Sequence, residues 1–374
     1  MRTKAILLIA ILFLGQQLFA QLSTEDEKKI QEFLQSTNTP AVSIAIVDNY
    51  ELTYVKAFGV KDIETGEKAD PQTLFQAASI SKPITGSFIM KAVEKGKMKL
   101  DEPIRTYLTS FELKKPKDIA EPTVRHLLSH TAGTNMSGFY GYKPTRKRMP
   151  DNLMVLRGKR TYIWERQIKV KKAPGTEQKY SGGGYCVLQQ AVMDQEGKAF
   201  EDIMKEDMLH PIGMTSSFFG EAQTVEQKAN LSSGHKKKGD LIKGKNFVYP
   251  QLAAAGLWTT PTDLATFMVD MLKASKGASS TYLTQKSFEQ MIEAQELNHG
   301  EKIDRGLSFK LVPNGDQAVE VFRHSGSNYG YTCYMYGNRT NGKAVIIMFN
   351  RHQISGTPIR NMIWERIGFW EKNP

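Results

Sequence analysis

The sequence predicts an α+β fold, in which an α/β sandwich is joined to a helical lobe. Strand-like segments occur near both chain ends, and helical patterns dominate the middle from about 100 to 250. We therefore expect one antiparallel sheet built from both ends and flanked by the terminal helices. Because no internal repeat or long low-complexity linker divides the chain, residues 21–374 are predicted to form one domain. Its sheet lobe would span about 21–85 and 255–374, and its helical lobe about 86–254.

The N-terminal part of the predicted sheet is a hairpin. Val42–Val47 is apolar and β-branched, Asp48 and Asn49 supply a turn, and Leu52–Val55 has the composition of a return strand. An apolar helical face follows over 84–93 and ends near Gly96, with a proline tolerated in its first turn.

The rest of the chain predicts further helices and a second hairpin. Each segment shows the periodicity of its element, bounded by turn residues. We expect helices over 123–130, 185–193 and 262–272, strands over 332–336 and 344–349 joined by a turn at 338–342, and a closing amphipathic helix over 360–370.

The first 20 residues are typical of an export signal. Arg2 and Lys4 precede the apolar run Ala5–Leu14, and Leu18–Ala20 offers a cleavage site before Gln21. The apolar run is shorter than the roughly 20 residues that span a bilayer. We therefore expect a cleaved signal and an exported protein, periplasmic or secreted, without a stable membrane span.

Charge and cysteine content exclude some classes of function. The net charge is +11, but its basic runs at 143–148, 169–172 and 235–245 are scattered, and no nucleic-acid-binding module accompanies them. Solvated surface is the favoured interpretation, with a small molecule or peptide as the partner and no nucleic acid. Cys186 and Cys333 are compatible with a disulfide in an exported protein or with two buried thiols.

Ser79 and Lys82 are the first candidate catalytic residues. They lie three residues apart at a predicted helix start, so their side chains share one face. A hydroxyl becomes a competent nucleophile when a neighbour takes its proton, and a partly desolvated lysine can help. The same spacing recurs at Ser233 and Lys236, inside the polar run 232–240, which is typical of a solvated loop. Context therefore favours Ser79.

Two later segments supply candidate partners. Tyr180 precedes a glycine-rich stretch, and a phenol near a lysine has a lowered pKa that suits a general base. His324 and Gly326 lie in a second glycine-rich stretch, where a strand edge can donate an N–H group to an oxyanion hole. A core tyrosine and a surface histidine at a hairpin corner are the alternatives.

Taken in order, three motifs resemble those of the serine beta-lactamase and penicillin-binding-protein superfamily. They are Ser79-x-x-Lys82, Tyr180-Ser-Gly182 and His324-Ser-Gly326, and their class C-like branch includes D-alanyl-D-alanine peptidases, D-aminopeptidases and esterases. The resemblance covers roughly 35–355 and implies a beta-lactamase/transpeptidase-like fold in a bacterial protein. Supporting matches lie at 127–133, 174–176, 210–214 and 255–264.

The resemblance also implies a role for each motif residue. Ser79 resembles the acylated nucleophile, and Lys82 resembles the group that assists its deprotonation. Tyr180 resembles the base that relays protons during acylation and activates the deacylating water. The backbone N–H groups of Ser79 and Ser327 would form the oxyanion hole, and His324 takes the place of a lysine found in many relatives.

Two positions depart from the pattern of the family. Gly182 stands where relatives often have an asparagine, whose amide can bond both the lysine and an acylamino group of the substrate. His324 is only partly charged near neutral pH, so it would grip a substrate carboxylate less firmly than lysine. Both count, with Gly326 and Ser327, among the predicted substrate-binding and oxyanion-binding residues.

The expected function is hydrolysis of a small ester, or of an amide or peptide of D-residue type, through an acyl-enzyme on Ser79. A beta-lactamase or D-Ala-D-Ala carboxypeptidase is the alternative, and a catalytically silent cell-wall-binding homologue is the second. Substrates would include peptidoglycan-derived ones, and no cofactor or metal is expected. His126 and His130 share the spacing of a zinc-protease helix, but that motif needs a glutamate where this chain has Leu127. Specificity is expected in the loops 139–149 and 232–250.

Overall fold

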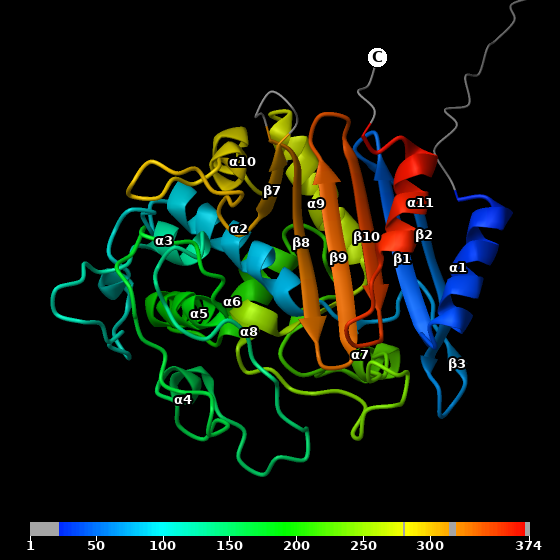
Figure 1. The fold of residues 1–374 in the computed structure, drawn as a ribbon, viewed down its shortest axis with the longest axis horizontal. Coiled ribbons are helices and arrows are strands. Elements are labelled where there is room, and N and C mark those ends of the chain that lie inside the picture. Colours follow the sequence, from blue (N-terminus) through cyan, green and yellow to red (C-terminus); the bar gives the residue numbers. More distant parts are fainter. Residues whose placement is uncertain (1–21, 280, 314–318, 371–374) are drawn as a thin grey trace, which may run out of the picture.

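A seven-stranded antiparallel sheet made from both chain ends forms one side of the molecule (Figure 1). The computed structural model describes residues 22–279, 281–313 and 319–370, so the predicted export signal lies outside the described residues. The strand order is β3-β2-β1-β10-β9-β8-β7, with β1 and β10 at the junction of the N-terminal and C-terminal halves. The strands are β1 (Ala41–Asp48), β2 (Glu51–Asp62), β3 (Glu67–Lys68), β7 (Lys310–Pro313), β8 (Val319–Asn328), β9 (Tyr331–Asn338) and β10 (Lys343–Phe349).

The two faces of the sheet are covered by different helices. Because side chains alternate along a strand, Val42, Ile44 and Ile46 of β1 pack against α1 (Thr24–Ser36) and α11 (Thr357–Ile367). Ala45 and Val47 face the opposite way, into the larger core with α9 (Pro261–Ser275) and α2 (Ser81–Glu94). Burial on both faces explains why β1 is an almost continuous apolar run.

The middle of the chain forms a helical part beside β7 and β8 (Figure 1). A three-stranded sheet, ordered β4-β6-β5, connects it to the segment before α2. The remaining elements are β4 (Phe75–Gln76), β5 (Phe218–Phe219), β6 (Leu257–Thr259), α3 (Val124–Leu128), α4 (Asn152–Leu156), α5 (Gly182–Glu196), α6 (Phe200–Met204), α7 (Val225–Asn230), α8 (Leu252–Ala255), α10 (Gln285–Ile292), and the short turns η1 (Ala78–Ile80), η2 (Ile104–Tyr107) and η3 (Lys205–Leu209).

The predicted α+β fold and its antiparallel sheet from both chain ends are confirmed, while several boundaries differ. The turn of the first hairpin is Asn49–Tyr50, both with positive φ, rather than Asp48–Asn49. The helix predicted from residue 185 begins at Gly182, because Ser181 caps it by accepting a hydrogen bond from Gly184 N–H. The last helix ends at Ile367, where Gly368 adopts a left-handed conformation.

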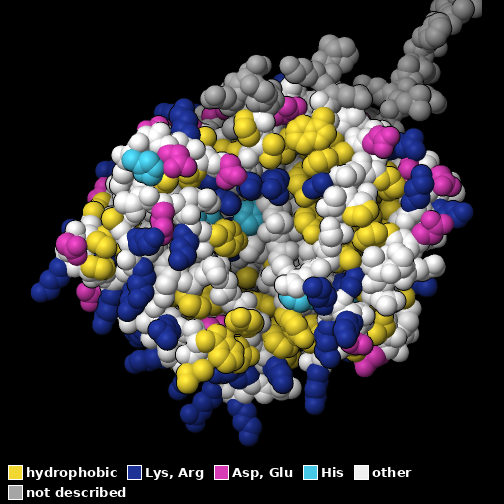
Figure 2. All heavy atoms as spheres, in the orientation of Figure 1, with side chains coloured by type: hydrophobic (Ala, Val, Ile, Leu, Met, Phe, Trp, Pro, Cys, Tyr) yellow, Lys and Arg dark blue, Asp and Glu magenta, His cyan; other side chains and the backbone are white. Residues whose placement is uncertain are grey.

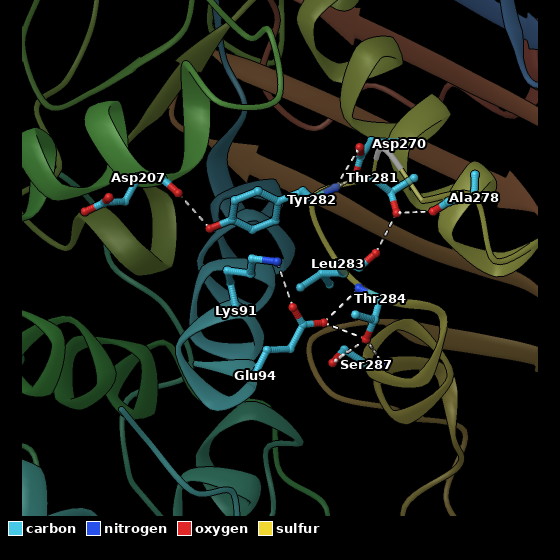
Figure 3. A network of polar contacts seen from close by, with 10 residues as sticks. All are labelled: Lys91, Glu94, Asp207, Asp270, Ala278, Thr281, Tyr282, Leu283, Thr284 and Ser287. Carbon is cyan, nitrogen blue, oxygen red and sulfur yellow. Dashed lines mark hydrogen bonds and ion pairs between the residues drawn. The ribbon is translucent and has the colours of Figure 1, made fainter. Parts of the chain in front are cut away.

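A polar network fastens the far end of α2 to α9, α10 and η3 (Figure 3). Glu94 accepts hydrogen bonds from the N–H and the hydroxyl of Thr284, each 2.7 Å long. Asp270 accepts from Tyr282 N–H, and the Tyr282 hydroxyl donates to the carbonyl of Asp207 at 2.7 Å. The helix that follows the candidate nucleophile is therefore anchored at its C-terminal end.

Within the described residues, no helix combines the length and apolarity needed to cross a bilayer. Cys186 and Cys333 are buried free thiols, which decides between the two possibilities left open by the sequence. Burial raises the pKa of both thiols well above the ordinary value.

Candidate active site

Ser79 lies in the 3₁₀ turn η1, immediately before α2 rather than inside it. Ala78 has a φ of +50°, a left-handed conformation that costs free energy for a residue with a side chain. The two residues that flank Ser79, Ala78 and Ile80, are buried, whereas Ser79 itself is partly exposed. The turn therefore holds a single hydroxyl at the surface of a tightly packed segment.

Lys82 extends from the first turn of α2 to the Ser79 hydroxyl. Its Nζ lies 3.1 Å from Ser79 Oγ and donates to the carbonyl of Ala254 at 2.7 Å. The residue is only 2% exposed, and among the described residues it forms no ion pair. The lysine is thus oriented by two oxygen atoms and faces the candidate nucleophile without a competing carboxylate.

Strand β8 runs beside this turn at very short range. A Cβ atom built on Gly326 would lie 2.2 Å from the carbonyl oxygen of Ala77 and 3.0 Å from Ser79 N, so only glycine fits there. The pairing of β7 with β8 ends at Arg323. After Arg323, β8 is hydrogen-bonded to β9 on one side and forms an open sheet edge on the other. Because backbone groups alternate in direction along a strand, alternate N–H groups of this segment point away from β9, out of the sheet edge. Ser327 is exposed at this edge.

Tyr180 is fixed from both sides by His130. The His130 carbonyl accepts a hydrogen bond from Lys179 N–H at 2.8 Å, and its Nδ1 accepts one from Ser181 N–H at 3.2 Å. The His130 and Tyr180 rings lie 4.4 Å apart between centroids. Lys82 Nζ lies 4.9 Å from the centroid of the Tyr180 ring, so the structure brings Ser79, Lys82 and Tyr180 together.

His130 also has an unusual electrostatic state. Since Nδ1 accepts a hydrogen bond, the neutral ring carries its proton on Nε2, which is buried and has no hydrogen-bond partner among the described residues. Burial, together with the charges of Arg305 and Lys82, holds the pKa of His130 well below its ordinary value. The sequence analysis named His130 only as part of the supporting family match at 127–133 and, together with His126, as a possible pair of zinc ligands. His126 instead contributes to the capping box of α3, and no metal-binding cluster occurs among the described residues.

Gly182 starts the first turn of α5 beside the candidate tyrosine. A Cβ atom there would lie 3.0 Å from Cε2 of Phe139 and 3.3 Å from the carbonyl oxygen of Ser137. The side chain of Phe139 therefore occupies the space next to the position where relatives often have an asparagine. The expected loop 139–149 reaches the site in this way, and Tyr142 pairs with Val248 of the second expected loop through two 2.8 Å hydrogen bonds.

His324 lies in the middle of β8 and is 6% exposed. Its ring centroid is 6.2 Å from that of Tyr180, and its Nδ1 contacts the carbonyl of Ser325 at 2.8 Å. Its Nε2 has no hydrogen-bond partner within the described part of the chain. Burial and the positive charges of Lys82 and Arg305 hold the pKa of His324 well below its usual range. This lowered pKa makes a charged imidazole less favourable at position 324 than in an exposed histidine.

Arg305 is a residue of this site that sequence reasoning missed. Its guanidinium carbon lies 5.8 Å from the centroid of the Tyr180 ring, and Arg305 forms no ion pair with any carboxylate of the described residues. No motif surrounds it in the sequence, and only the folded chain brings it from the loop before β7 to Tyr180. In the orientation of Figure 1, the surface is hollowed between the helical part and the sheet, with histidine and basic side chains at the hollow (Figure 2).

The second copy of the Ser-x-x-Lys pattern is not a second site. The Ser233 hydroxyl is buried and donates to Asp62 at 2.9 Å, whereas Lys236 is exposed. The prediction of a solvated loop is wrong for the first half of this run, because Ser232–His235 is buried.

Comparisons with known proteins identify the family of the chain and relatives of its fold. A family model described as Beta-lactamase matches residues 27–362. A teichoic acid D-alanine hydrolase of Staphylococcus aureus is 26% identical over 239 residues, which cover 63% of this chain and 55% of that relative. The match thus spans only about half the length of that curated relative.

Solved structures show the same fold. An octameric penicillin-binding protein homologue from Pyrococcus abyssi superimposes with a TM-score of 0.73 at 24% identity, over 94% of this chain and 78% of the other. The D-alanine carboxypeptidase AmpC from Burkholderia cenocepacia gives a TM-score of 0.69 at 20% identity, over 92% and 98% of the two chains.

Proposed function

This chain belongs to the beta-lactamase family of serine hydrolases, and we propose that it is an exported enzyme with Ser79 as its acylated nucleophile. Its substrate would be a small ester, or an amide or peptide of D-residue type. The observation that carries the proposal is the 3.1 Å contact between Lys82 Nζ and Ser79 Oγ, beside the edge of β8 and the ring of Tyr180.

In the proposed acylation step, Ser79 Oγ attacks the carbonyl carbon of the substrate while its proton passes toward Lys82 and Tyr180. Tyr180 then gives a proton to the leaving atom as the bond to the acyl carbon breaks. In deacylation, Tyr180 takes a proton from a water molecule that attacks the acyl-enzyme, and Ser79 recovers its proton. The neutral His130 fixes the backbone on both sides of Tyr180 throughout.

The oxyanion hole is proposed to consist of the N–H groups of Ser79 and Ser327. The near contact of Gly326 with Ser79 N supports this, since it brings the edge of β8 against η1. Donors that are fixed before the reaction stabilise the developing negative charge without reorganising. Gly182, with its neighbour Phe139, would shape the space for the acyl group.

The name of the Staphylococcus aureus relative, a teichoic acid D-alanine hydrolase, favours a D-alanine derivative as one class of substrate. A beta-lactamase or D-Ala-D-Ala carboxypeptidase is the second candidate, because the three motifs are also those of such enzymes. Gly182 argues against an efficient beta-lactamase, since it lacks an amide that could bond an acylamino group. A catalytically silent cell-wall-binding homologue would lack the acyl-enzyme altogether.

Covalent labelling tests the nucleophile directly. The protein without its first 20 residues is treated with a fluorophosphonate, and the adduct is mapped by mass spectrometry. We expect one adduct on Ser79, lost in Ser79→Ala and retained in the matched control Ser233→Ala. Labelling that survives Ser79→Ala would refute the assignment.

A substrate panel then separates the candidate functions. The panel comprises a short-chain nitrophenyl ester, a D-alanyl ester, a D-Ala-D-Ala peptide and a chromogenic cephalosporin. The proposal predicts turnover of the esters or the D-peptide well above that of the cephalosporin. Cephalosporin turnover as the dominant activity would favour the beta-lactamase alternative.

A further inference from the structure

Three large hydrophobic side chains are exposed together on the loops that flank α4. Tyr140, Ile163 and Trp164 are 66%, 92% and 56% exposed, and they are three of the seven large hydrophobic residues that the described chain leaves exposed. Figure 2 shows hydrophobic side chains gathered at the end of the molecule where Figure 1 places α4. Exposed apolar groups that gather in one place mark an interaction surface, whereas scattered ones need no explanation.

The exposed rings belong to a preformed stack. Tyr162 stacks on Tyr142 at 5.1 Å between centroids and on Trp164 at 4.9 Å. Tyr140 packs edge-on against Trp164 at 6.0 Å. The inner end of the stack is fixed because the buried Tyr142 hydroxyl donates to the buried carboxylate of Glu165 at 2.5 Å. A packed base therefore presents the exposed residues to the solvent.

The same segment carries a concentrated positive charge. Residues 143–166 contain eight lysines and arginines and two acids, which gives +6 of the net charge of +11 of the whole chain. One of the acids, Glu165, is buried, and the other, Asp151, caps α4. Among the described residues, none of the eight basic side chains forms an ion pair, since the salt bridges lie before and after this segment.

Arg146 joins the basic run to the aromatic stack. Its guanidinium carbon lies 4.8 Å from the centroid of the Tyr142 ring and 5.7 Å from that of Tyr162. It also donates a hydrogen bond to the carbonyl of Arg160 at 2.7 Å. Figure 2 shows basic side chains projecting beyond the hydrophobic cluster at this end of the molecule. A partner that contacts the apolar residues therefore also meets the positive charges.

This combination favours a lipid surface over a glycan. A glycan stacks on open faces of aromatic rings, but Tyr162 covers one face of Trp164, and the most exposed residue, Ile163, is aliphatic. Tryptophan and tyrosine are enriched at the level of lipid headgroups, and an aliphatic side chain gains free energy by entering the acyl-chain boundary. Lysine and arginine are attracted to anionic lipids. An anionic bilayer offers both the negative charge and the apolar layer beneath it.

We propose that residues 140–148 and 159–166 form a docking surface for an anionic lipid bilayer. Ile163 and Trp164 enter the headgroup layer, and the surrounding basic side chains bind the lipid phosphates. This association is peripheral and does not depend on the proposed function. The loop that begins at Phe139 also reaches Gly182, so docking would hold the candidate active site close to the membrane surface.

Vesicle binding tests the proposal. The chain from Gln21 onward, the form expected after signal cleavage, is mixed with vesicles of phosphatidylcholine alone or of phosphatidylcholine and phosphatidylglycerol in a two-to-one ratio. Binding is measured by co-flotation. Because each basic residue near an anionic surface contributes about fivefold, we expect binding to the neutral vesicles to be at least about 100-fold weaker. Added salt should weaken binding to the anionic vesicles. Equal binding to both vesicles, or to neither, would overturn the proposal.

Substitutions then locate the docking surface. Ile163→Ser should weaken binding to the anionic vesicles at least about 10-fold, because one apolar side chain no longer leaves water. Lys147→Gln combined with Arg148→Gln should weaken it roughly 25-fold, because two charges are lost. All three residues are exposed, so the melting temperatures should match that of the wild type. Undiminished binding by either folded variant would contradict the proposal.

Matched controls remove the same groups elsewhere. Leu52→Ser deletes an exposed hydrophobic side chain at the start of β2, and Lys273→Gln with Lys286→Gln deletes two exposed charges on α9 and α10, away from α4 (Figure 1). These variants should bind within about threefold of the wild type, as expected for groups that do not reach the bilayer. A loss as large as that of the docking-surface variants would refute this location.

Tryptophan fluorescence identifies the occupant of the surface. Anionic vesicles with bromine atoms on the acyl chains should quench the fluorescence of Trp164, and Trp164→Phe should remove most of that quenching while it keeps an aromatic ring. Pull-down with isolated peptidoglycan and competition by soluble polyglycerol phosphate are measured in parallel. Binding to either polymer without quenching by the brominated lipid would assign the surface to a cell-wall polymer and overturn the proposal.

Discussion

Gly326→Ala perturbs the closest contact between β8 and the candidate nucleophile. The new methyl carbon would lie 2.2 Å from the Ala77 carbonyl oxygen and 3.0 Å from Ser79 N. Ordinary contact requires β8 and η1 to separate by roughly 1 Å. Both groups are backbone atoms of packed elements, so no flexible side chain can absorb the displacement.

The expected loss of activity follows from that displacement. A misplacement of about 1 Å in a reacting geometry can lower the rate roughly 10²-fold, because nucleophile and oxyanion donors lose alignment. Overpacking should also lower the free energy of unfolding by about 1–3 kcal/mol. The assay measures kcat/KM with the best ester of the panel, together with urea unfolding of the same samples.

Gly138→Ala is the matched control. A Cβ atom at Gly138 would have no heavy atom within 4 Å, so the same substitution adds a methyl group to open space. We expect its kcat/KM to stay within about threefold of wild type, as for surface substitutions that make no contact. A folded Gly326→Ala protein with the kcat/KM of the control would contradict the proposed alignment of β8 with Ser79.

Further substitutions examine other parts of the protein. Tyr180→Phe should lower kcat by about 10²–10⁴-fold without preventing folding, because the proposed proton relay is lost; unchanged turnover would exclude Tyr180 as the base. Gly182→Asn alone should not create an efficient cephalosporinase, because the edge of the Phe139 ring lies 3.0 Å from the new Cβ and leaves no room for the amide. Activity should require that Phe139 is also replaced by a smaller residue. Efficient cephalosporin hydrolysis by the single variant would disprove this steric explanation. Burial raises the pKa of Asp270 to about 6, above its unfolded value of 3.8, so its protonation stabilises the fold below about pH 4 and that stability is lost as the pH rises through 6. Relative to Asp270→Asn, wild type should therefore lose up to about 3 kcal/mol of unfolding free energy between pH 4 and 6.5 in urea titrations, and a pH-independent difference would contradict this.

The sheet was predictable because its strands carry strong local signals. The runs 42–47 and 344–349 are apolar and β-branched, and turn residues bound them. Their pairing with each other across about 300 residues, Val42 opposite Phe349, has no local signal; the strands at both chain ends predicted a shared sheet but not this pairing. The ends of elements were less predictable, because capping at Ser181 and Gly368 depends on side-chain and backbone geometry of the folded chain.

The sequence could identify residues of the candidate site only where they lie in a recognisable short motif. Ser79 and Lys82 lie on one short segment, so their contact follows from helical spacing. The bonds of His130 to the residues flanking Tyr180 join segments 50 residues apart, and nothing local indicates them. Arg305 reaches Tyr180 only through the loop hydrogen bonds before β7, so no sequence pattern could have identified it.

The location of positive charge connects these observations. Burial, together with the neighbouring charges of Lys82 and Arg305, lowers the pKa of His324, because protonating its ring would add a third cation to a buried space. Replacing Arg305 should raise the pKa of both His324 and His130, which share it as a source of repulsion.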